Sequence, residues 1–115
     1  MANTFKQISK AGVTSSDVIY TVAGSTTTVV LGLIIGNTQS SDITVTLTIS
    51  TDTSSRSGAN NEDNQPVELL TSTTIPANSS LELLAGNKIV LETTDVINLT
   101  ASAAADISIS VMEIT

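Results

Sequence analysis

Aliphatic and hydroxyl-bearing residues alternate in several segments of the chain. Residues 43–49 read Ile-Thr-Val-Thr-Leu-Thr-Ile, which places four aliphatic side chains on one face of an extended strand and three threonines on the other. Residues 107–111 repeat the pattern with Ile, Ser, Ile, Ser and Val, and residues 96–101 place Ile97, Leu99 and Ala101 on one side. A period of two residues predicts strands with one buried face and does not fit a helix.

Turn sequences separate further short strands. Residues 76–80 and the pair Gly86-Asn87 have turn chemistry, because Pro presets its φ angle and Gly or Asn tolerates a positive one. They bracket a strand at 81–84, with a hairpin turn before the next strand at 88–91. Further strands are expected at 67–72 and 17–22, and at 5–9 an edge strand or arm within residues 1–12. The fold prediction is all-β: a single-domain antiparallel β-sandwich, jelly-roll-like, with seven to nine strands over residues 1–115.

Residues 29–35 break the alternation, because apolar residues occupy both the odd and the even positions, and so both faces of an extended strand. Such a strand is either covered on both faces or turns its second face towards a neighbouring molecule. Gly32 and Gly36 are candidates for a β-bulge or a close backbone approach.

Residues 51–65 contain almost no apolar side chain and predict a long exposed loop between two strands. Arg56, the only arginine of the chain, is a candidate for a contact with a partner. Asn60 and Asn61 begin an oxygen-rich cluster that could hold calcium, but the cluster lacks the spaced acids of an EF-hand loop. We therefore expect no metal site and treat both asparagines as candidate partner contacts.

Composition argues against catalysis. The chain has no cysteine and no histidine, which excludes disulfides, thiol chemistry and imidazole-dependent mechanisms. Its eleven acidic residues are scattered among polar neighbours, and all but the pair Glu62-Asp63 occur singly. Tyr20 gives only weak support to a sugar-binding platform, and a core tyrosine with a bonded hydroxyl is the preferred interpretation. We expect a non-enzymatic protein with no catalytic residues and no cofactor.

Charge narrows the choice of partners. The formal net charge is −7 and the pI about 4.1, which disfavours nucleic acids and anionic membranes as partners. The chain shows no signal-peptide pattern and no apolar run long enough for a bilayer, so we expect a soluble protein made inside the cell. Within residues 1–12, Lys6 and Lys10 occur without any acid and form a candidate clasp for an acidic neighbour. Phe5 beside them is a further candidate partner contact.

The order of several phrases along the chain resembles that of small structural virion proteins of tailed bacteriophages, particularly those of marine and cyanobacterial hosts. The resemblance covers most of the chain except residues 51–65. The phrases are Met1-Ala-Asn-Thr-Phe-Lys, Lys10-Ala-Gly-Val, Ile19-Tyr-Thr-Val-Ala, Ser25-Thr-Thr-Thr-Val-Val-Leu-Gly-Leu, Ile75-Pro-Ala-Asn-Ser-Ser-Leu, Lys88-Ile-Val-Leu-Glu and the closing Ala-Ser-Ala-Ala-Ala-Asp106-Ile.

This resemblance implies a β-sandwich or jelly-roll subunit, present in many copies in the virion after synthesis in the host cytoplasm. The implied function is capsid decoration or cement, with other virion proteins, above all the major capsid protein, as partners. A neck or tail component is one alternative, and a receptor- or glycan-binding module with residues 51–65 at its tip is another. The scarcity of aromatic residues limits the core, so self-association, for example as a trimer, is expected to add buried surface. No active-site residue is carried over by the resemblance.

Overall fold

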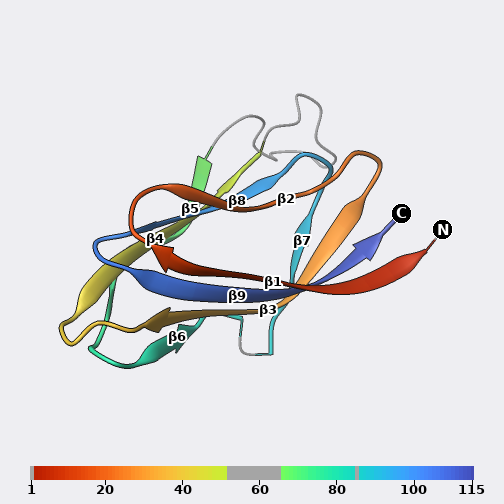
Figure 1. The fold of residues 1–115 in the computed structure, drawn as a ribbon. Coiled ribbons are helices and arrows are strands. Elements are labelled where there is room, and N and C mark those ends of the chain that lie inside the picture. Colours follow the sequence, from red (N-terminus) through yellow and green to blue (C-terminus); the bar gives the residue numbers. More distant parts are fainter. Residues whose placement is uncertain (1, 52–65, 85) are drawn as a thin grey trace.

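The structure is a computed structural model and describes residues 2–51, 66–84 and 86–115. Within these ranges the chain forms nine strands in two antiparallel sheets that pack face to face (Figure 1). Sheet A contains β1 (Asn3–Val13), β9 (Ala105–Ile114), β3 (Thr27–Asn37), β6 (Ser80–Glu82) and β7 (Ile89–Leu91). Sheet B contains β2 (Asp17–Thr21), β8 (Val96–Ala101), β4 (Ile43–Ser50) and β5 (Pro66–Ile75). The predicted all-β sandwich is therefore confirmed.

The strand order is that of a jelly roll. In sheet A the order is β1-β9-β3-β6, with β7 also paired to β3, and in sheet B it is β2-β8-β4-β5. If β6 and β7 count as one interrupted strand, the pairs β1 with β9, β2 with β8, β3 with β6 and β7, and β4 with β5 are nested within one another. This nesting is the pattern of an eight-stranded antiparallel double-sheet sandwich. It brings the two termini side by side, and Ala2 and Thr115 exchange backbone hydrogen bonds of 3.3 and 3.0 Å.

The predicted hairpin turn at Gly86-Asn87 is wrong. β6 and β7 do not pair with each other; both run antiparallel to β3, β6 opposite its C-terminal half and β7 opposite its N-terminal half. Gly86 does adopt a positive φ of 83°, as a turn glycine is expected to do. β6 and β7 thus follow one another along the same edge of β3, because β3 is longer than either of these short strands.

A bulge in β3 explains much of its two-sided hydrophobicity. The register with β9 shifts between Val30 and Gly32, so that Leu31 is inserted without a partner. Before the bulge Thr28 and Val30 are buried, and after it Leu33, Ile35 and Asn37 are. The inward-facing parity changes at the bulge, as expected for an extra residue in one strand. Of the two candidate glycines, Gly32 follows the bulged residue directly, whereas Gly36 pairs regularly with Asp106 and marks no bulge.

The core lies between the sheets and is aliphatic apart from Tyr20. In β4 the alternation predicts the outcome, since the aliphatic residues up to Leu47 are buried and the threonines between them are not. Leu33 and Ile109 of sheet A, and Leu47 and Leu99 of sheet B, are almost completely inaccessible to solvent. The described residues form no helix, and therefore none that could span a membrane.

Candidate interaction surface

Four apolar side chains form a row across the outer face of sheet A. Phe5 of β1 pairs with Met112 of β9, Met112 pairs with Val29 of β3, and Val29 pairs with Val90 of β7. Phe5 is 71% exposed and Val90 62% exposed, whereas Met112 and Val29 are half-buried between them. We call these four residues the apolar row. Contiguous exposed apolar surface of this kind is typical of sites that bind another protein or a ligand.

A groove lies on the same face, two rows further along the strands. Its volume is about 450 Å³, and its lining includes Ser9 and Ala11 of β1, Ser108 of β9, and Ile34 and Gly36 of β3. The groove exists because most of the outward side chains here are small or absent. Of the five, Ile34 has the largest side chain, and it is 43% exposed.

The outer face of sheet B is covered by hydroxyl groups instead. Thr46 pairs with Thr100, and Thr48 pairs with Asn98, across β4 and β8. Sheet B also has exposed aliphatic side chains, Val18 on β2 and Val67 and Leu69 on β5. Because β2 and β5 are the two opposite edges of sheet B, these side chains do not form a row across the sheet, and water satisfies the hydroxyl groups between them.

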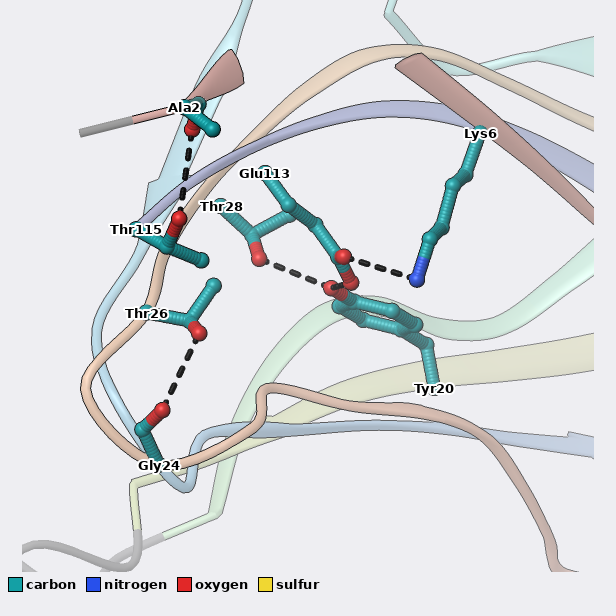
Figure 2. Close-up of polar contacts among 8 residues, drawn as sticks. All are labelled: Ala2, Lys6, Tyr20, Gly24, Thr26, Thr28, Glu113 and Thr115. Carbon is teal, nitrogen blue, oxygen red and sulfur yellow. Dashed lines mark hydrogen bonds and ion pairs between the residues drawn. The ribbon is translucent and has the colours of Figure 1, made fainter. Parts of the chain in front are cut away.

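Lys6 points inward and takes part in a polar network at one end of the sandwich (Figure 2). Its ammonium lies 2.8 Å from a carboxylate oxygen of Glu113 on β9. The Tyr20 hydroxyl, from β2 in the opposite sheet, donates to the other oxygen of Glu113 at 2.5 Å and accepts from Thr28 at 2.8 Å. The network therefore ties sheet B to three strands of sheet A.

The pKa values of Tyr20 and Glu113 in this network shift in opposite directions. Burial, followed by the hydrogen bond to Glu113, raises the pKa of Tyr20 from 10.0 to about 12. The hydrogen bonds from Lys6 and then Tyr20 lower the pKa of Glu113. Tyr20 is thus a core residue with a bonded hydroxyl, and its ring is not available as a platform for sugars.

Lys10 binds within its own chain as well. Its ammonium lies 3.1 Å from the Asp17 carboxylate and donates to the Val18 carbonyl at 2.8 Å, which connects β1 to β2 across the open side of the sandwich. Inward-pointing lysines on an edge strand also discourage pairing with another chain at that edge. A clasp to an acidic neighbour by Lys6 or Lys10 stays a prediction, and it would compete with these internal contacts.

The remaining candidates fall in two groups. Phe5, predicted as a partner contact, lies on the surface at one end of the apolar row. Arg56, Asn60 and Asn61, with most of the predicted loop, lie outside the described residues. Among the described residues, no group of three or more acidic side chains is close enough to hold a metal ion.

Sequence reasoning did not identify Met112, Val29 and Val90 as parts of one surface. The signal was present in part, since residues 29–35 are apolar on both parities and one alternative was contact with a neighbouring molecule. The register of four strands, distant in sequence, was needed to align them. No protein-family model, curated protein or solved structure matches this chain.

Proposed function

We propose that this protein is a non-enzymatic structural component of a tailed-phage particle, which decorates the capsid shell and stabilises it through protein–protein contacts. The apolar row on the outer face of sheet A carries the proposal. Covering the exposed Phe5 and Val90 and the half-buried Met112 and Val29 is favourable at roughly 25 cal/mol per Å² of apolar surface removed from water. Contact with another protein removes this surface from water, and no catalysed reaction is needed.

Two further observations support this function. The phrase order described above resembles that of small virion proteins, and jelly rolls are common among capsid proteins. Fold alone does not determine function, however, since the same architecture also occurs in lectins. The surface and the phrase order therefore carry more weight than the fold.

The decisive experiment is a cryo-electron-microscopy map of the source particle, together with the copy number of this chain. We expect jelly-roll subunits in hundreds of copies on the outer shell. A few copies at the neck or tail would favour the alternative structural role, and absence of the chain from the particle would contradict the proposal.

A binding assay tests the surface itself. Shells stripped of this chain are incubated with the wild type, with the double variant Phe5→Ser, Val90→Ser, or with Val18→Ser, which alters an exposed aliphatic residue on sheet B. We expect the double variant to lose binding and the control to retain it. Equal binding by all three would remove the apolar row from the proposal.

A glycan- or receptor-binding role makes a different prediction. It requires binding to a glycan array or to host cells, and only a few copies per particle. The burial of Tyr20 leaves Phe5 as the one aromatic ring of the chain on the surface. Array binding that Phe5→Ser abolishes, together with a low copy number, would favour this alternative.

A further inference from the structure

The outer face of sheet A has a raised half and a low half on the same strands. Along β1 the outward residues run from Phe5 through Gln7 and Ser9 to Ala11, and along β9 Met112 is followed by Ser110 and Ser108. The apolar row forms the raised half, and the groove lies over the small residues of the low half. Gln7 and Ser110, which pair with each other, lie midway between the two.

This arrangement is self-complementary. A two-fold axis that crosses the strands at Ser110 would place the Phe5 of one copy over Ser9 of the other. Met112 would lie over Ser108 by the same operation. Val29 would lie over Ile34 of the other copy, and Val90 over Glu82. Phe5 and Met112 thus face the small side chains of the other copy's groove, and the contact is isologous because both copies use the same surface.

The distribution of charge favours the same orientation. Among the described outward-facing residues of sheet A, the ionised side chains are those of Glu82 and Asp106, both in the low half. The two-fold arrangement brings each carboxylate towards the uncharged half of the other copy. An axis parallel to the strands would instead stack apolar row on apolar row and bring the acidic halves together.

The size of the face suits such a pair. Four strands about 4.8 Å apart and about ten residues long, at roughly 3.3 Å per residue, project an area of roughly 600 Å². A standard interface removes about 800 Å² of accessible surface from each partner. Protruding side chains make the accessible area of the face larger than this flat projection. The area that pairing would bury is therefore at the lower end of the range for stable dimers.

We infer that the outer face of sheet A pairs with a second copy of this chain, with Phe5 and Met112 of each copy seated in the groove of the other. The inference rests on the proposed function and names the partner that covers the apolar row: a second copy covers it, and the shell is then contacted by another face of the pair. The assembled unit on a particle is then a two-fold pair.

Sedimentation equilibrium of the full chain tests the pairing. We expect a monomer–dimer equilibrium for the wild type and for Val18→Ser, and a dissociation constant about ten-fold higher or more for Phe5→Ser. Because Phe5 is largely exposed, this substitution leaves the fold intact, which circular dichroism verifies. A wild type that stays monomeric, or that forms trimers, would overturn the inference.

Cross-linking tests the orientation. The chain has no cysteine, so a single introduced thiol reports on its own position alone. With a bis-maleimide linker of about 10 Å, the spacing of packed sheets, we expect Ser110→Cys to give covalent dimers and Thr100→Cys on sheet B to give none. Dimers from Met112→Cys and not from Ser110→Cys would overturn the proposed axis.

The two proposals fail in different ways. A chain that is monomeric in solution but binds shells overturns the pairing and leaves the decoration role intact. A chain that dimerises through this face but is absent from particles supports the pairing and contradicts the decoration role.

Discussion

The two sheets of this protein bury the same kind of side chain inward and present different surfaces outward. Val45, Leu47 and Leu99 of sheet B face Leu33 and Ile109 of sheet A in one aliphatic core. Outward, the central strands of sheet B carry threonines, and its exposed aliphatic side chains lie on the two edge strands, whereas sheet A carries the apolar row and a groove.

The difference separates folding from assembly. Inward residues of both sheets are required for the chain to fold, and their exchange for smaller ones is costly in either sheet. The outward threonines of sheet B satisfy both strand propensity and solubility. The outward Phe, Met and Val side chains of sheet A contribute little to the fold, which is why we assign them to contact with another subunit.

The first prediction tests the equivalence of the inner faces. Leu33→Ala in sheet A and Leu47→Ala in sheet B should each lower the free energy of unfolding by about 2–5 kcal/mol, because each leaves a cavity in the shared core. Urea unfolding followed by circular dichroism measures both. A loss below about 1 kcal/mol for either variant would show that its sheet contributes little to the core.

The second prediction concerns the polar bridge between the sheets. Tyr20→Phe removes the hydroxyl and leaves Glu113 and Thr28 without that partner, which should cost about 1–3 kcal/mol of unfolding free energy. The effect is smaller than that of a leucine cavity because the ring still fills its place. An unchanged free energy of unfolding for Tyr20→Phe would mean that the hydrogen bonds of this hydroxyl do not stabilise the packing of the two sheets.

The pH dependence of stability follows from the same residues. Because folding raises the pKa of Tyr20 from 10.0 to about 12, the stabilisation is complete below pH 10 and is lost as pH rises towards 12. Because folding lowers the pKa of Glu113 from 4.5, its contribution is present above that value and is lost as pH falls further. Tyr20 is the only tyrosine, so phenolate absorbance reports its ionisation directly, and Tyr20→Phe should weaken the alkaline dependence. Titration near pH 10 in the folded protein would contradict the buried position.

The third prediction concerns the edge strand of sheet A. Gly12 has a positive φ of 70° at the bulge where β1 shifts register against β9, and its amide donates to Asp106 at 3.0 Å. Gly12→Ala should cost about 1 kcal/mol, because a side chain strains this backbone conformation. Gly24→Ala is the control, since Gly24 has no positive φ and open space around it. Equal stability of the two variants would show that the bulge relaxes without cost.

The smallest effect is expected on the outer faces. Val90→Thr on sheet A and Thr100→Val on sheet B should each change the unfolding free energy by less than about 0.5 kcal/mol. The two variants should differ in association: Val90→Thr weakens the dimer and Thr100→Val leaves it unchanged, as measured by sedimentation. Weakening by Thr100→Val would remove the distinction between the two faces.

Much of the fold could be predicted from the sequence because strand pattern and turn chemistry are local. Residues 96–101 were predicted with the same bounds as β8, and residues 43–49 fall within β4. The bulge at Gly32 was anticipated as one of two roles for that glycine. The hairpin between residues 81–84 and 88–91 was not correct, because pairing partners depend on which edges remain free once the other strands are placed.

The surface could be predicted only in part. Phe5, Lys6 and Lys10 were candidate contacts, but the ion pairs of the two lysines with Glu113 and Asp17 within the chain were not predicted. Whether a side chain on an edge strand points in or out depends on its register with β9, which no local pattern specifies. Arg56, Asn60 and Asn61 lie outside the described residues, so their roles stay predictions.

By itself, the sequence determined that this chain is an aliphatic β-sandwich without histidine or thiol chemistry, since composition and a two-residue period act locally along each strand. Only the tertiary structure decided that Phe5, Met112, Val29 and Val90 share one face, and that Tyr20 bridges the sheets to Glu113. These relations join residues up to about a hundred positions apart. The register of nested strand pairs creates them, and that register is a property of the whole fold.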